Sequence, residues 1–194
     1  NYQSYNIAVT GASPNGGVDA VPSNNSTSKK VIILSQRPDK NVMIEEFTTA
    51  QCQYCPMGGT KVEDILSAHT YAVSASIHAG FGTDAMTTND MEEIADTLDE
   101  NGAPAIMVDR VYWDDEEAIA MNTGWTLTNW DDKTVARKAA LVPVTIKGSN
   151  TYNTQTRELS VSATAKFYSA ISNSDYRINC YIIEDSVTGT GSGY

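Results

Sequence analysis

The sequence predicts an α/β domain over residues 31–141, followed by a small antiparallel, sandwich-like all-β domain over residues 142–194. Two patterns predict this division. Up to residue 141, short apolar runs alternate with segments whose apolar residues recur at helical spacing, which is typical of an α/β fold. From residue 142 on, apolar and polar residues alternate one by one, which is typical of antiparallel strands with one face in solvent.

The chain begins with a polar segment. Residues 1–30 are rich in Asn, Ser, Gly and Pro, so we expect a loop or linker there. One alternating stretch within it, Tyr5–Thr10, can form an edge strand. Two apolar runs then predict the first strands of the α/β domain, VIIL (31–34) and VMIEEF (42–47). The second run is mostly apolar, which suits a strand that is covered on both faces.

A helix and a strand are predicted next. Val62, Ile65 and Leu66 recur at helical spacing, and they predict a helix directly after the first two cysteines. The segment YAVSASIH (71–78) alternates between apolar and polar residues, as a strand does. The chain therefore returns to the sheet after this helix.

Residues 89–101 give the clearest helix. Asn89 is a suitable capping residue at its start, and Gly102 is a typical helix stop. A strand over residues 103–113 and a helix over residues 131–140 complete the predicted α/β domain.

The all-β domain rests on three alternating segments, which begin at Val142, Leu159 and Tyr176. Each carries apolar residues on one face and polar residues on the other, so we expect an antiparallel sheet with one wet face. Cys180 shares its predicted strand face with two isoleucines. We therefore expect it to be a buried free cysteine that packs as a small hydrophobic side chain.

Composition excludes some classes of protein. The 194 residues are 41% hydrophobic and 19% charged, which is ordinary for a globular protein with a real core. No apolar run approaches the roughly 20 residues that cross a bilayer, so no transmembrane span is expected. Asp and Glu number 24 against 13 Lys and Arg, and the net charge of −11 argues against nucleic-acid partners.

The chemistry of the chain centres on its C-x-x-C pair, Cys52 and Cys55, placed between the predicted strand at 42–47 and a helix. At a helix N-terminus, unpaired N–H groups and the helix dipole favour a thiolate, so Cys52 is the candidate nucleophile. Two intervening residues keep Cys55 close enough to resolve a mixed disulfide. Gln53 and Tyr54 lie between the sulfurs and are expected to tune the pair and contact a substrate.

Two other interpretations of the pair stay open at this point. A metal site would need two further ligands, and only His69, His78 and the distant Cys180 are available, none of them closely paired. We expect no metal and no cofactor other than the disulfide itself. An inert disulfide is the second alternative, although so small a loop removes little entropy from the unfolded chain.

Four segments in order carry a resemblance: EEFT (45–48), CQYCP (52–56), IHAG (77–80) and GAPAIMVDR (102–110). Together they resemble the thioredoxin superfamily, and in particular the Omp28-related proteins of Bacteroidetes, which are thioredoxin-like envelope proteins. The resemblance covers about residues 31–141, and the all-β tail is similar to that of the family. It implies a central mixed sheet flanked by helices, and export to the periplasm, the outer membrane or the cell surface.

The resemblance also implies roles for individual residues. Pro104 matches the cis-proline that faces the dithiol and, with the preceding Ala103, holds an extended peptide substrate; the alternative is a trans proline that begins a strand. Glu46 lies six residues before Cys52 and matches the buried acid of thioredoxins, whose raised pKa lets it relay a proton of the resolving thiol. The alternative for Glu46 is a surface position, and Glu45 must point to the opposite face.

The chain has two histidines, whose expected positions differ. His78 ends the strand at 71–78, and the carboxyl ends of parallel strands share one edge of a sheet, so its imidazolium could stabilise the Cys52 thiolate. A histidine hydrogen-bonded within its loop is the alternative. His69 falls on the apolar face of the helix after the cysteines and is expected to be packed there.

These observations lead to two hypotheses. The first is an exported thiol–disulfide oxidoreductase that acts on protein or peptide thiols and disulfides, with an unidentified electron donor or acceptor; it requires that solvent reach the Cys52 sulfur. The second is a non-catalytic binding protein, associated with the outer membrane or the surface, on a thioredoxin-like scaffold.

Overall fold

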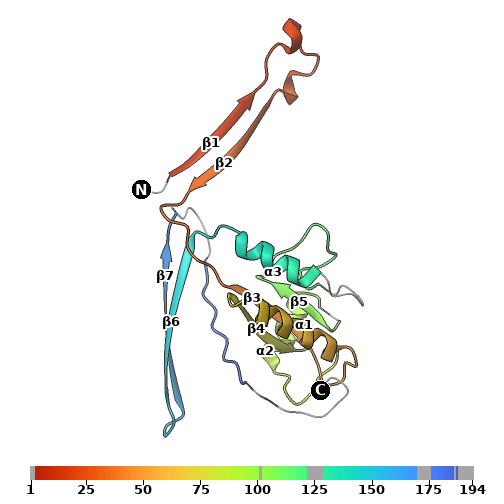
Figure 1. Cartoon of the computed structure of the whole chain (residues 1–194), viewed down its shortest axis with the longest axis vertical. Coiled ribbons are helices and arrows are strands. Elements are labelled where there is room, and N and C mark those ends of the chain that lie inside the picture. Colours follow the sequence, from red (N-terminus) through yellow and green to blue (C-terminus); the bar gives the residue numbers. More distant parts are fainter. Residues whose placement is uncertain (1–2, 101, 122–128, 170–175, 186, 188–194) are drawn as a thin grey trace. The chain divides into compact units, whose positions relative to one another are not determined.

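The computed structural model describes residues 3–100, 102–121, 129–169, 176–185 and 187 (Figure 1). Among them, residues 40–140 and 178–187 form one compact unit, and residues 3–39 and 141–177 form another. We call them the α/β unit and the hairpin unit. The domain boundaries predicted from the sequence remain a prediction.

The α/β unit is built on a three-stranded mixed sheet in the order β4-β3-β5. The central strand β3 (Val42–Thr48) pairs in parallel with β4 (Ala72–His78) and antiparallel with β5 (Ala105–Val108). In this register Glu45 of β3 lies between Ala75 and Met107. Strand β3 confirms the strand that the sequence predicts at 42–47.

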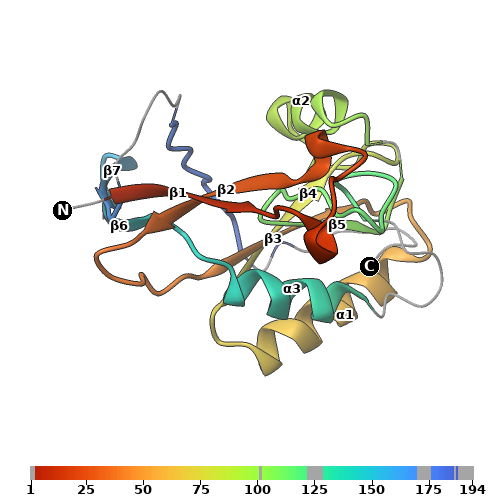
Figure 2. The same cartoon turned by 90° about the horizontal axis from the view of Figure 1, so that it is seen from above.

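Helices cover both faces of this sheet (Figure 2). Helix α1 (Cys55–Ala68) and helix α3 (Asn129–Ala139) pack on one face, where their apolar residues share a core with β3 and β5. Helix α2 (Asn89–Thr97) packs on the other face. The core of the first face consists of Val42, Ile44, Val62, Ile65, Ala72, Ile106, Val108, Met121 and Trp130.

The helix ends differ from the prediction by a few residues. Helix α2 begins after Thr88, whose Oγ1 accepts a hydrogen bond from the Met91 N–H at 3.3 Å, so Thr88 and not Asn89 is the cap. The helix ends at Thr97 because Asp99 has a φ of +53°, in the left-handed region. Sequence periodicity locates a helix well, but its ends depend on individual backbone hydrogen bonds.

The hairpin unit contains two antiparallel hairpins. One joins β1 (Gln3–Thr10) to β2 (Ser26–Ile33), with two short 3-10 turns, Pro14–Gly16 and Pro22–Asn24, in its connection. The other joins β6 (Val144–Asn153) to β7 (Glu158–Phe167). The loop predicted for residues 26–30 is wrong, since these residues pair with β1 and VIIL continues that strand instead of entering the α/β sheet.

The third strand predicted from Tyr176 is also wrong, because residues 176–185 have no regular secondary structure. Cys180 is exposed there and not buried as expected. The physical reason is a competing contact, since Tyr181 bonds to side chains of the α/β unit. An alternating pattern defines two faces, but it forms a strand only where a neighbour supplies the hydrogen bonds.

Candidate functional site

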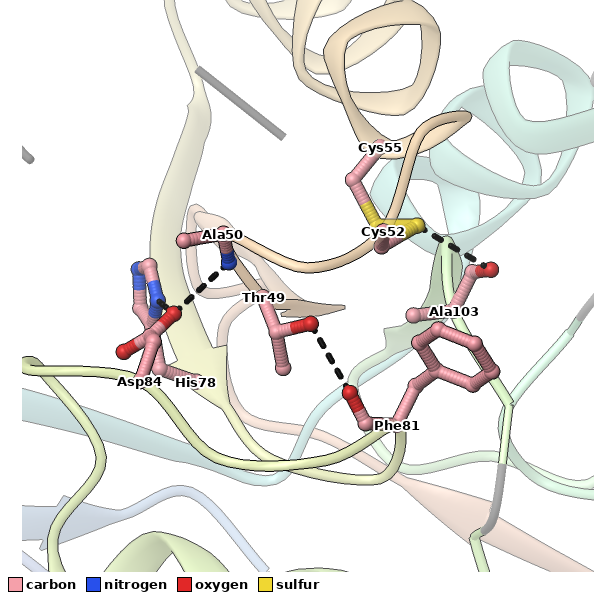
Figure 3. The surroundings of a disulfide bond; sticks show 8 residues. All are labelled: Thr49, Ala50, Cys52, Cys55, His78, Phe81, Asp84 and Ala103. Atoms are coloured by element: carbon pink, nitrogen blue, oxygen red, sulfur yellow. Dashed lines mark hydrogen bonds and ion pairs between the residues drawn. A yellow bond between two sulfur atoms is a disulfide. The ribbon is translucent and has the colours of Figure 1, made fainter. Parts of the chain in front are cut away.

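A disulfide joins Cys52 and Cys55, whose Cα atoms are 5.4 Å apart, in the connection between β3 and α1 (Figure 3). The chain turns sharply after β3: the Cys52 N–H donates to the Thr49 carbonyl at 3.1 Å. The Cys55 N–H then donates to the Cys52 carbonyl at 3.2 Å, and α1 begins at Cys55 with Pro56 in its first turn. Cys52 therefore precedes the positive end of the helix by one turn.

The Ala103–Pro104 peptide bond is cis, and it lies beside the disulfide. The Sγ of Cys52 is 3.4 Å from the carbonyl oxygen of Ala103 (Figure 3). Sulfur in a disulfide carries no hydrogen, so the two atoms are simply in contact; the thiol of a reduced Cys52 could donate to the same oxygen. The structure thus brings together Cys52, Cys55, Ala103 and Pro104.

Glu46 lies on the same side of the sheet as α1. Its side chain is buried, and its Oε1 has no hydrogen-bond partner among the described residues. A Cβ added to Gly58 would stand 3.2 Å from this oxygen and 2.5 Å from the Pro104 Cβ. Gly58 follows Cys55 by three positions, hence on the same face of α1. The carboxyl group therefore faces the part of the helix that carries Cys55.

Burial determines the protonation of this carboxyl group. Loss of solvent contact, with a smaller contribution from the negative charge of Glu63, raises the pKa of Glu46 to about 7. At neutral pH the group is thus close to its midpoint and can either accept or donate a proton. That property suits a proton relay beside a dithiol.

Glu45 lies on the opposite face of β3, as strand geometry requires. Its carboxylate accepts two hydrogen bonds from Arg110, one from Nε at 2.8 Å and one from Nη2 at 2.7 Å. It also accepts one from the Tyr181 hydroxyl at 2.7 Å. Burial, followed by the hydrogen bond to Glu45, raises the pKa of Tyr181 to about 12. Sequence reasoning assigned no role to Arg110 or Tyr181, although Arg110 belongs to the MVDR motif.

His78 does not lie at the sulfurs. Its Nδ1 bonds to Asp84 Oδ2 at 2.7 Å, and the same oxygen accepts the Ala50 N–H at 2.8 Å. Figure 3 shows His78 and Asp84 together, away from the disulfide. Burial raises the pKa of Asp84, but the hydrogen bonds from His78, Ala50 and Met86 outweigh that effect and lower it overall. Within the described structure His78 positions a loop and is not placed to stabilise a thiolate.

The remaining residues of the sequence interpretation fall in two places. Gln53 and Tyr54 are exposed next to the disulfide, with Tyr54 at 42%. His69 is half-buried, packs near the Tyr71 ring and bonds to Asp131 Oδ1 at 2.8 Å. In the described part of the chain, no three or more His, Cys, Asp or Glu side chains are grouped as metal ligands.

One expectation for the site is not met. The sequence interpretation required a Cys52 sulfur that solvent can reach, but Cys52 and Cys55 are each only 2% exposed. The turn at residues 49–52 is held against the loop that follows β4: Thr49 Oγ1 donates to the Phe81 carbonyl at 2.8 Å, and Gln51 Nε2 donates to the Thr83 carbonyl at 2.7 Å. Exchange at Cys52 therefore requires that covering groups move.

Comparison of the chain with protein-family models finds no match, and neither does comparison with curated proteins or with solved structures. Among the described residues, no helix combines the length and the apolar character that a bilayer span needs.

Proposed function

We propose that the α/β unit is a thioredoxin-like thiol–disulfide oxidoreductase. The observation that carries the proposal is the Cys52–Cys55 disulfide between a buried strand and a helix, with the Ala103 carbonyl 3.4 Å from one sulfur. The mixed sheet with helices on both faces supports the thioredoxin-like assignment. Membership of the Omp28-related proteins, and a place in the periplasm, the outer membrane or the cell surface, belong to the same proposal.

The reaction begins with the reduced pair. The Cys52 thiolate attacks one sulfur of a substrate disulfide, the substrate S–S bond breaks, and the second substrate sulfur leaves as a thiolate. Cys55 then loses its proton and attacks Cys52 Sγ, which releases the first substrate sulfur and forms the Cys52–Cys55 disulfide. Two electrons pass from the protein to the substrate; run in reverse, the same steps oxidise a substrate dithiol.

Glu46 has a defined part in the second step. Its carboxyl group faces the part of α1 that carries Cys55, and its pKa of about 7 allows it to take up the Cys55 proton near neutral pH. A carboxylate with an ordinary pKa would be a much weaker base. The Ala103 carbonyl and the backbone around Pro104 would hold an extended substrate peptide beside Cys52.

The test is to trap the mixed disulfide. Cys55→Ser removes the resolving thiol, so we expect covalent adducts between Cys52 and protein or peptide thiols, detected by mass spectrometry and released by reductant. Cys52→Ser is the matched control and should trap nothing. The absence of adducts, together with a Cys52 pKa of about 8.5 or higher in the reduced protein, would show that the pair is inert.

A second candidate function is binding without catalysis. The observation in its favour is the β6–β7 hairpin, where several apolar residues of one face are exposed; Ile146 is 62% and Val161 51% exposed. Contiguous exposed apolar surface often marks an interaction site. If Ile146→Thr with Val161→Thr abolishes capture of a partner while Cys52→Ser leaves it intact, binding and not exchange is the function.

A further inference from the structure

The loop between β4 and α2 lies against both segments that flank the sulfurs. Gly80 and Gly82 have φ values of +87° and +71°, a conformation that glycine adopts without strain. A Cβ added to Gly80 would stand 3.3 Å from the Gly102 carbonyl, directly before Ala103. A Cβ added to Gly82 would stand 3.0 Å from Gln51 Oε1, directly before Cys52.

Phe81 is the residue between these two glycines. One neighbour lies close to the segment that leads to Ala103 and the other lies close to the segment that leads to Cys52, so the Phe81 backbone lies between the two sides of the site. The Phe81 carbonyl is fixed by the Thr49 hydroxyl at 2.8 Å. Figure 3 shows the ring directed toward Ala103, the residue whose carbonyl contacts Cys52 Sγ.

The loop is held in place by several hydrogen bonds. Asp84 accepts the Ala50 N–H and bonds to His78, and Thr83 accepts from Gln51. The Phe81 side chain itself is 50% exposed, whereas Cys52 is 2% exposed. A half-exposed aromatic ring on an anchored loop thus points toward Ala103, whose carbonyl contacts the sulfur of the almost fully buried Cys52 (Figure 3).

We infer that Phe81 is a selectivity residue, which shields Cys52 from small hydrophilic thiols and is displaced by polypeptides that carry an apolar side chain next to their cysteine. This inference rests on the proposed function. An apolar substrate side chain can pack against the ring and offset the cost of moving it, which a tripeptide thiol such as glutathione cannot do. The substrate class is therefore a peptide or protein segment with an apolar residue adjacent to its cysteine.

The step measured is reduction of the Cys52–Cys55 disulfide. A thiolate attacks Cys52 Sγ, the disulfide breaks and Cys55 leaves as a thiolate. A second thiol molecule then attacks the sulfur of the first, which releases Cys52 and forms the disulfide of the reductant. The rate is followed in the intact chain by alkylation and mass spectrometry, with glutathione and with two short cysteine peptides that differ only in Leu or Ser beside the cysteine.

For Phe81→Ala we expect the glutathione rate to rise about tenfold, which corresponds to a barrier lowered by about 1.4 kcal/mol. We also expect the preference for the Leu peptide over the Ser peptide to fall toward one. Phe81→Leu keeps an apolar cover and should retain most of both properties. Tyr112→Ala is the matched control, since Tyr112 is an equally exposed aromatic (55%) in the loop after β5, and it should change neither rate.

Two results would overturn the inference: a glutathione rate in Phe81→Ala equal to that of Tyr112→Ala, or a faster rate with an unchanged peptide preference. If Phe81→Ala does not fold, an unchanged rate and preference in Asp84→Asn, which loosens the loop, would count against it equally. The proposed function fails on a different observation, the absence of trapped adducts in Cys55→Ser. Glutathione reduces the disulfide whatever its biological role, so the two failures are distinguishable.

Discussion

The two faces of strand β3 hold adjacent glutamates in opposite situations. Glu45 and Glu46 are 2% and 5% exposed, so each has lost nearly all of its water. Glu45 regains polar partners from Arg110 and Tyr181, whereas Glu46 Oε1 has none among the described residues. One carboxyl is held by a guanidinium and a phenol, and the pKa of the other is raised to about 7.

Burial alone does not determine what a carboxyl group does. A buried carboxyl group that bonds to a bidentate arginine serves the structure. A buried carboxyl without a partner keeps its proton to higher pH and is available for proton transfer. The unpartnered group is the one that faces the disulfide-bearing helix, which is where a functional interpretation needs it.

The largest expected effect comes from removing the arginine that bonds to Glu45. Arg110→Ala leaves a carboxylate in a site that is only 3% exposed, so the free energy of unfolding should fall by about 3–5 kcal/mol. All three tryptophans lie between residues 113 and 130, so denaturant unfolding followed by tryptophan fluorescence reports on the α/β unit. Arg110→Lys keeps the charge but not the paired hydrogen bonds and should lose less. Equal losses in the two variants would mean that the bidentate geometry contributes nothing.

The raised pKa of Glu46 should make the free energy of unfolding depend on pH. The Glu46 carboxyl group has a pKa of about 7 in the folded state and 4.5 in the unfolded state, so it keeps its proton to higher pH when the protein is folded. Stability should therefore fall as pH rises from about 4.5 to about 7, by about 3 kcal/mol in total, and level off above that range. Urea unfolding across pH 4 to 8.5 should show this fall in the wild type but not in Glu46→Gln. Parallel curves for the two proteins would mean that the raised pKa is absent.

Two neighbouring glycines of α1 offer a matched pair on the Glu46 side. Gly58→Ala would push a methyl group against Pro104, and such overpacking costs about 1–3 kcal/mol, more than the gain in helix propensity. Gly59→Ala meets only Glu46 Oε1, at 4.0 Å, and should stabilise the helix by up to about 1 kcal/mol. Thermal unfolding of both variants checks the opposite signs. A stabilising Gly58→Ala would argue against close packing of α1 on Pro104.

The smallest effect concerns the phenol that completes the Glu45 side. Tyr181→Phe removes the hydrogen bond to the Glu45 carboxylate and the one accepted from Arg110, both at a partly exposed position, and we expect a loss of about 1 kcal/mol. Tyr112→Phe is the control and should be neutral. The spectrophotometric titration of tyrosine should also lose a group with a pKa of about 12 in Tyr181→Phe. If that group persists in the variant, Tyr181 is not the residue that is shifted.

Much of the α/β unit could be predicted because its signals are local. The apolar run at 42–47 predicted a strand covered on both faces, and the sequence predicted a helix at each of the three described helices of this unit. The two hairpins were harder to predict from the sequence. Residues 26–30 carry a loop-like composition but find a pairing partner in β1, and the alternating residues from Tyr176 find none.

The candidate site divides in the same way. Cys52 and Cys55 are recognisable because three positions along the chain bring their sulfurs together. Arg110 and Tyr181 meet Glu45 from 65 and 136 positions away, and no spacing rule reports such contacts. The position of Phe81 could not be predicted for a related reason, because the glycines on either side of it lie close to segments that are distant in sequence.

The reactive residues, and the face of each strand that they occupy, could be recognised in the sequence, because the spacing of cysteines and the alternation of side chains are properties of neighbouring residues. Which carboxyl group obtains a partner, and how deeply Cys52 is buried, depends on the folded chain. Hydrogen bonding and burial depend on segments brought together from distant parts of the chain, and these contacts set the pKa of Glu46 and the access to Cys52.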